Sequence, residues 1–193
     1  MSLQRRHRKQ VKHYDIPGHA HFLTFSCYQR LPLLSKDRTR RWFVEALEEA
    51  RAQQAFDLWA WVIMPEHIHL LLRPRRVKYR MARILAAIKK PVGTSAIQYL
   101  RDHAPAFLKR LTVVHRGRTY HRFWQAGGGQ DKNLDEPRGI HEVVAYIHAN
   151  PVRRGLVERP EDWYWSSAAD WAGAEHVPLR VDRTLPPLVQ GTD

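Results

Sequence analysis

Residues 56–74 read FDLWAWVIMPEHIHLLLRP, and this stretch decides the fold. Its first half is rich in aromatic and β-branched side chains, which favours a β-strand. The dipeptide at 65–66 is typical of a turn, and HIHLLLR at 67–73 is typical of a second strand. Two strands joined by so short a turn predict an antiparallel hairpin. Because side chains alternate between the faces of a strand, His67 and His69 are expected on the same face.

The segments on either side of this hairpin extend the pattern to a whole fold. We expect a strand at 21–28, a helix at 36–54, a helix from 81 that Pro91 interrupts, short strands around Gly117, a glycine-rich loop at 126–139, and a helix that starts at Pro137 and ends before Pro151. Strands and helices in this order indicate an α+β fold. The predicted architecture is a ferredoxin-like or RRM-like antiparallel sheet with helices packed mainly on one face.

The composition indicates a partner that carries negative charge. The 193 residues include 32 Lys and Arg but only 19 Asp and Glu, a formal net charge of +13. Such a surplus favours nucleic acid over an anionic membrane surface, because Lys and Arg at phosphates release condensed counterions. No apolar stretch is long enough for a membrane span, and the basic N-terminus lacks the apolar region of a signal peptide. Cys27 is the only cysteine, which fits a reducing cytoplasm. Together with the basic charge, this predicts a cytoplasmic, nucleoid-associated protein that binds nucleic acid.

The two histidines of the hairpin allow two interpretations. Imidazoles on one face of a strand can both reach one metal ion, yet twelve histidines make one such pair by chance unremarkable. With a single cysteine, the other ligands would be nitrogen and oxygen donors, so Mg²⁺ or Mn²⁺ is as plausible as Zn²⁺. Glu66 either orients His67 or is simply a turn residue, and we favour the turn.

The helix from Pro137 presents two faces. An apolar stripe faces the core and contains Ile140, Val143, Val144 and Ile147, whereas Glu142, Tyr146 and Asn150 form a second stripe. Tyr146 is therefore either a tyrosine at the rim of the core or a functional residue. Asn150 is either a helix-capping residue or part of the same site.

Two motifs together resemble the REP-associated tyrosine transposases, of the HUH single-tyrosine transposase superfamily. They are PEHIHLLL at 65–72 and YIHANPVRRGLVERPEDWYWSS at 146–167, and the resemblance runs from about Tyr14 to Ala169. It implies that His67 and His69 are metal ligands, that Tyr146 is the catalytic tyrosine on its helix, and that Asn150 completes the metal site. Related insertion-sequence transposases usually carry Gln at this last position.

The resemblance also implies an activity: an HUH single-tyrosine transposase and nicking endonuclease with Mg²⁺ or Mn²⁺ as cofactor. Such an enzyme cleaves single-stranded DNA next to a hairpin, as in REP-like repeats, and leaves a 5′-phosphotyrosine and a free 3′-hydroxyl. The sequence does not identify a general base that would deprotonate Tyr146, because the spacing selects neither Glu142 nor His148. The alternatives are a non-catalytic hairpin-binding protein and a metal-dependent phosphodiesterase that uses water.

Basic residues are expected along the DNA path. They are Arg73, Arg75, Arg76, Lys78 and Arg80 after the histidine strand, and Arg153 and Arg154 after the tyrosine helix. The expected organisation is a basic arm at 1–13, the HUH transposase domain at 14–170 and a C-terminal tail at 171–193. A monomer and a homodimer both remain possible.

Overall fold

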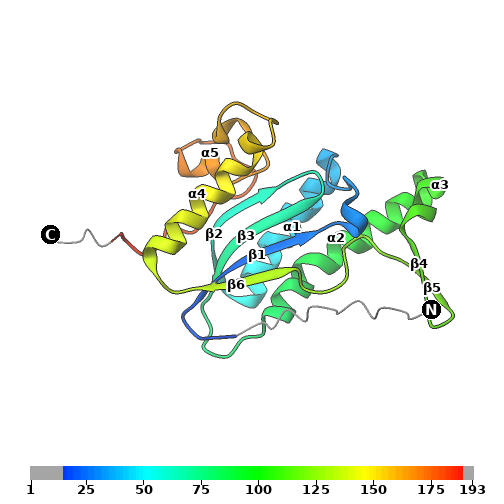
Figure 1. Ribbon diagram of the computed structural model, residues 1–193, viewed down its shortest axis with the longest axis horizontal. Coiled ribbons are helices and arrows are strands. Elements are labelled where there is room, and N and C mark those ends of the chain that lie inside the picture. Colours follow the sequence, from blue (N-terminus) through cyan, green and yellow to red (C-terminus); the bar gives the residue numbers. More distant parts are fainter. Residues whose placement is uncertain (1–14, 189–193) are drawn as a thin grey trace, which may run out of the picture.

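The computed structural model describes residues 15–188, so the predicted basic arm at 1–13 lies outside the described residues. At its centre is an antiparallel sheet with the strand order β2-β3-β1-β6 (Figure 1). Its strands are β1 (Ala20–Ser26), β2 (Phe56–Ile63), β3 (His67–Pro74) and β6 (Gln130–Leu134). The predicted hairpin is β2–β3, and the predicted α+β fold with an antiparallel sheet is confirmed.

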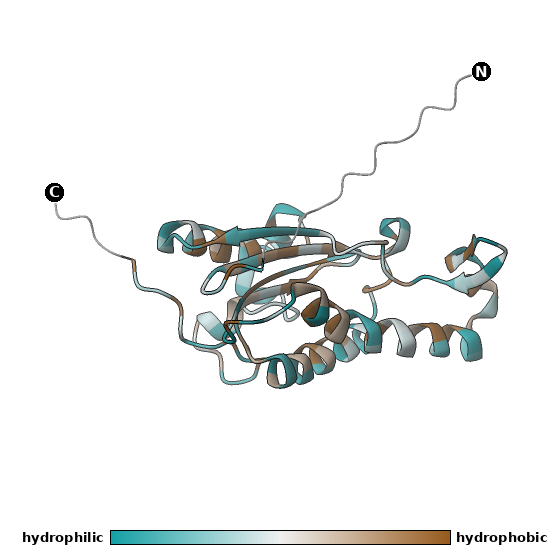
Figure 2. Cartoon of the chain, turned by 90° about the horizontal axis from the view of Figure 1, so that it is seen from below, coloured by the Kyte–Doolittle hydropathy of each residue, from teal (hydrophilic) through white to brown (hydrophobic). Residues whose placement is uncertain are grey.

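Helices cover both faces of the sheet. Helices α1 (Asp37–Gln54) and α2 (Met81–His103) pack on the face that carries Leu23 and Phe25 of β1, as the layers in Figure 2 show. Helix α4 (Pro137–Arg153) packs on the opposite face through Ile140 and Ile147. Two of these three helices thus share one face, as expected.

The fourth strand of the sheet is not the one that the sequence suggested. The segment around Gly117 forms a separate hairpin of β4 (Thr112–His115) and β5 (Arg118–His121), which projects beyond the sheet (Figure 1). Strand β6, which pairs with β1, lies in the stretch that we expected to be a loop. Its sequence QDKNL has no alternating apolar residues, and it is an edge strand in which only Leu134 is a buried apolar residue.

Both prolines that were expected to end helices lie inside them. Helix α2 continues past Pro91, and α4 continues past Pro151 to Arg153. The fixed φ of proline is compatible with a helix, and only one backbone hydrogen bond is lost at each position. In α2, residues before and after Pro91, such as Ile88 and Val92, are buried in the same core and hold the two halves in line.

The remaining elements are short. They are the helices α3 (Pro105–Leu108) and α5 (Ala168–Trp171) and the 3₁₀ turns η1 (Tyr28–Arg30), η2 (Lys109–Leu111) and η3 (Pro160–Asp162). Within residues 15–188, no helix is both long and apolar enough to span a membrane.

The chain after α4 lies along the free edge of β2. The amide of Ile63 donates to the carbonyl of Trp165 over 2.9 Å, and the amide of Asp182 donates to the carbonyl of Leu58 over 2.8 Å. Leu179 and Val181 are buried in the core with α1 and α2. The described part of the predicted C-terminal tail therefore packs against the domain.

Candidate active site

The two histidines of β3 converge on one point. His67 and His69 lie on the face that carries α4, and their Nε2 atoms are 3.1 Å apart. Burial lowers the pKa of both, and that of His69 falls to about 3 because the neighbouring His67 adds to the effect. Both imidazoles are therefore neutral at pH 7, and each can offer a nitrogen lone pair.

Each imidazole is held through its other nitrogen. The Nδ1 atom of His67 lies 3.2 Å from Oε1 of Glu66, and Nδ1 of His69 lies 2.8 Å from Oγ1 of Thr24. These contacts leave Nε2 of both rings to face the shared point. Glu66 is buried and also accepts a hydrogen bond from Nη1 of Arg154 over 3.0 Å. Our preference for Glu66 as a mere turn residue was therefore wrong.

Helix α4 brings Tyr146 and Asn150 to the histidines. The Tyr146 ring is 39% exposed, and its centroid lies 5.6 Å from that of His69. Asn150 is buried one turn later, where its Nδ2 donates to the carbonyl of Tyr146 over 2.7 Å. Interaction with the Asn150 side chain partly opposes the fall in the His69 pKa, and Asn150 lines the same cavity as the histidine pair.

These four side chains share one cavity of about 470 Å³. Its remaining lining consists of Phe22, Thr24, Phe25, Ser26, Arg30, Gln125, Ala126, Gly129, Gln130 and Arg154. Among residues 15–188, no group of three or more His, Cys, Asp or Glu could hold a metal ion. Any metal here would be held by His67, His69 and the amide oxygen of Asn150.

These donors fit a divalent cation that keeps some of its coordination positions open for other ligands. Two nitrogens each about 2.1 Å from one ion and at right angles around it are about 3 Å apart. The observed separation of 3.1 Å is close to that value, so His67 and His69 could hold one ion with little movement. Neutral donors would leave the charge of the ion uncancelled, and the cavity gives room for oxygen ligands from a substrate.

The predicted DNA-contacting residues fall into two groups. Arg153 and Arg154 lie at the site: Cζ of Arg153 is 5.4 Å from the centroid of the Tyr146 ring, and Arg154 bonds Glu66. The other group lies at the far end of β3. Since a strand rises about 3.3 Å per residue, Arg73 is about 20 Å from His67.

In that distant group, some side chains already have protein partners. Arg73 donates to Asp57 over 2.7 Å, Arg75 lies 3.8 Å from the same carboxylate, and Arg76 donates to the carbonyl of Gln53 over 3.3 Å. Lys78 and Arg80 line a small basic pocket with Arg76. Their role in DNA binding stays a prediction.

The two candidate bases for Tyr146 are engaged elsewhere. Glu142 forms an ion pair with Arg138 over 3.1 Å on the exposed side of α4. Nε2 of His148 lies 2.9 Å from Oγ of Ser167, and burial lowers the pKa of His148 to about 4. The structure therefore selects neither residue as the base.

Comparison with known proteins bears on the resemblance read from the sequence. No protein-family model matches the chain. A curated protein of Haemophilus influenzae, named "Putative REP-associated tyrosine transposase", is 27% identical over 168 residues, which cover 78% of this chain and 90% of that protein. The chain is similar to REP-associated tyrosine transposases. The resemblance to these transposases is thereby confirmed.

A solved structure supports the same relationship at the level of the fold. The solved structure described as "Structure of the REP associates tyrosine transposase bound to a REP hairpin" superposes on this chain with a TM-score of 0.64. The match covers 96% of this chain and 93% of that chain at 21% sequence identity. The fold that surrounds the histidine–tyrosine cavity is thus the fold of a REP-associated tyrosine transposase.

Proposed function

We propose that the protein is a metal-dependent single-strand DNA endonuclease and strand transferase that acts through Tyr146. The observation that carries this proposal is the convergence of two neutral imidazoles, 3.1 Å apart, beside an exposed tyrosine ring in one cavity. A protein that only bound DNA would have no need for this combination. The name of the Haemophilus relative, a transposase, supports a DNA-processing enzyme.

The chemistry follows from the position of the tyrosine. The Tyr146 oxygen forms a bond to the phosphorus of the scissile phosphate while the bond from phosphorus to the 3′-oxygen breaks. The proton lost by the phenol is balanced by the one gained by the departing 3′-hydroxyl. A bound divalent cation would polarise the phosphate and reduce its repulsion of the attacking oxygen. The 5′-phosphotyrosine keeps the bond energy, so a free 3′-hydroxyl can later reseal the strand without ATP.

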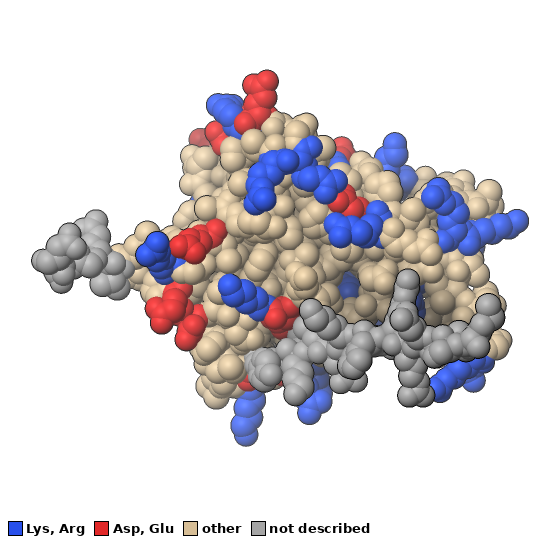
Figure 3. Space-filling view, viewed as in Figure 1, with Lys and Arg blue, Asp and Glu red and all other residues tan. Residues whose placement is uncertain are grey.

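The substrate that we propose is single-stranded DNA beside a hairpin. Arg153 and Arg154 place positive charge at the cavity, and Lys and Arg gather over the upper middle and the right-hand end of the face that carries α4 (Figure 3). The solved relative is bound to a REP hairpin, which supports a hairpin as the recognised element. A tyrosine on a helix can reach a scissile phosphate most readily where the strand is unpaired.

The test uses hairpin oligonucleotides from the repeats beside its own gene, labelled at either end and incubated with Mn²⁺ or EDTA. We expect a metal-dependent covalent adduct that carries the 3′ side of the cut and is absent in Tyr146→Phe. Tyr164→Phe is the matched control, because Tyr164 is also exposed but does not line the cavity.

Other outcomes would select the alternatives. Cleavage that survives Tyr146→Phe would indicate a metal-dependent phosphodiesterase that uses water. Tight binding of the hairpin without cleavage in any metal would indicate a non-catalytic hairpin-binding protein.

A further inference from the structure

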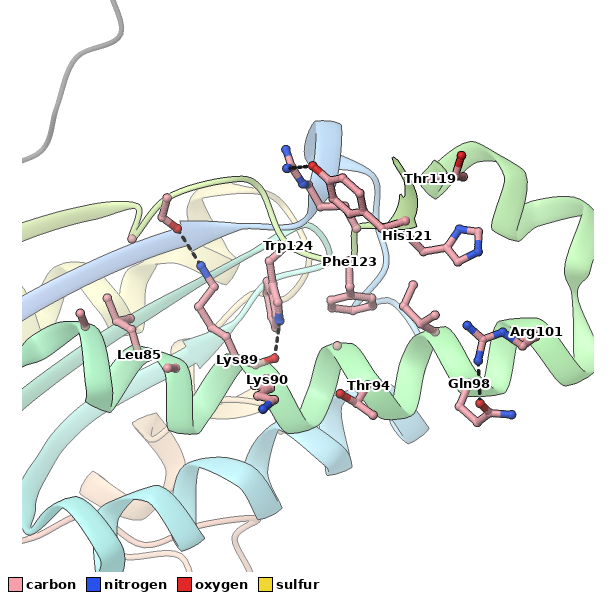
Figure 4. A pocket seen from close by; sticks show the side chains of 18 residues that line it. Leu85, Lys89, Lys90, Thr94, Gln98, Arg101, Thr119, His121, Phe123 and Trp124 are labelled. Carbon is pink, nitrogen blue, oxygen red and sulfur yellow. Dashed lines mark hydrogen bonds between the residues drawn. The ribbon is translucent and has the colours of Figure 1, made fainter. Parts of the chain in front are cut away.

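The surface carries a second groove, larger than the cavity of the proposed active site. It is a groove of about 940 Å³ between α2 and the β4–β5 hairpin (Figure 4). We propose that this groove binds the unpaired DNA strand that leads from the hairpin to the scissile phosphate. This inference rests on the proposed function, because it assigns a path to the substrate of that reaction.

The charge of the groove suits a polyanion. Lys89, Lys90 and Arg101 line it from α2, and Arg122 lines it from the opposite wall. Of the lining residues in the described part of the chain, none is Asp or Glu. Lys90 and Arg101 are eleven residues apart on one helix, which corresponds to about 16 Å. Cations on both walls and along this length can contact successive phosphates of one strand.

The floor of the groove distinguishes an unpaired strand from a duplex. It is apolar and includes Leu85 and Ile97 of α2 together with Phe123 and Trp124. Figure 4 shows Phe123 and Trp124 against α2. Tyr120, which is exposed, adds an aromatic ring on the hairpin side. The bases of a paired stem are stacked and hidden, whereas unpaired bases can turn towards apolar and aromatic surface.

The groove and the catalytic cavity share one thin wall. Gln125 and Gln130 line the catalytic cavity, while Gly127 and Gly128, between them in sequence, line the groove. Nζ of Lys89 donates to the carbonyl of Gly127 over 3.0 Å, which ties this loop to α2. Glycines at the crossing point leave no side chain in the way of a strand that passes from one hollow to the other.

Crosslinking tests the path directly. Cys27 is fully buried, so a new exposed cysteine would be the reactive one. A photoreactive aryl azide on Thr94→Cys, in the groove, should crosslink to the unpaired flank of a hairpin oligonucleotide and not to its stem. The same probe on Glu48→Cys, exposed on α1, is the control. Crosslinks to the stem, or no more than with the control, would overturn the proposal.

Charge removal provides a second, independent measurement. The double variant Lys90→Gln/Arg101→Gln should lower the salt dependence of binding to a flanked hairpin, with a fall of about 1.4 in the slope of log Kd against log salt, because each phosphate contact on a single strand contributes about 0.7. Binding to a hairpin without flanks should be unchanged. The matched control is Lys36→Gln/Arg41→Gln, which removes two exposed charges from α1 and the residue before it.

The possible results separate this inference from the proposed function. Equal loss for hairpins with and without flanks would mean that the groove binds the stem, which overturns the proposal. A change in oligomeric state without a change in DNA affinity would overturn it in favour of self-association. If the wild-type protein forms the Tyr146 adduct while the groove variants behave like their control, only the groove proposal fails. If flank binding depends on the groove but no adduct forms, the proposed function fails, and the groove stands as a binding site for the unpaired flank that leads to no scissile phosphate.

Discussion

His148 should make the stability of the protein depend on pH between 7 and 5. Burial lowers its folded-state pKa to about 4, whereas the pKa of an unperturbed histidine is about 6.5. Below pH 6.5 the unfolded chain binds a proton at this residue, and the folded protein does not until about pH 4. The stabilisation is thus fully present above pH 6.5 and is lost as the pH falls towards 4. Between pH 7 and pH 5 the loss is about 2 kcal/mol in the free energy of unfolding.

The His148→Gln variant isolates this contribution. Glutamine can keep a hydrogen bond to Ser167 but does not titrate. The other buried histidines titrate in both proteins, so their effect cancels in the difference. Urea unfolding followed by tryptophan fluorescence at the two pH values should show the wild type losing about 2 kcal/mol more than the variant. Equal losses would refute the reasoning and show that His148 is accessible to protons in the folded state.

Three other substitutions test the site and its surroundings. Tyr146→Phe should abolish the covalent DNA adduct on a denaturing gel while hairpin binding, measured by fluorescence anisotropy, is kept. Glu66→Gln should weaken Mn²⁺ binding roughly tenfold to a hundredfold, measured by the paramagnetic resonance of free Mn²⁺, because the histidine next to it loses its carboxylate partner. Gly129→Ala should lower the melting temperature more than Gly127→Ala: both glycines have positive φ, but only at Gly129 would a Cβ lie 2.1 Å from the carbonyl oxygen of Thr24.

The sequence predicted side-chain positions best in segments where polar and apolar residues alternate with the regular spacing of a strand or a helix. The alternation in residues 67–73 placed His67 and His69 on one face, and the helical stripes placed Tyr146 away from the core. These positions depend only on local geometry, so they could be predicted without the rest of the fold. The structure adds that both sets meet in one cavity.

The features that were missed depend on contacts between distant segments. Strand β6 has no pattern of its own, because its pairing with β1 and not its side chains makes it a strand. The role of Glu66 depends on Arg154, 88 residues later. Pro91 was read as a break because sequence alone does not show how strongly the buried side chains of α2 hold the helix together.

The sheet has two edges, and the chain shields each of them from intermolecular pairing in a different way. Strand β6 leaves one edge open but fills it with charged and amide side chains, which discourage another strand from adding to it. Strand β2 is apolar except for Asp57, which is paired with Arg73, and the segment from Trp165 to Asp182 occupies its backbone hydrogen-bonding groups. Without that segment, FDLWAWVI would be an exposed template for aggregation, so the residues that follow the tyrosine helix help to keep the protein in solution.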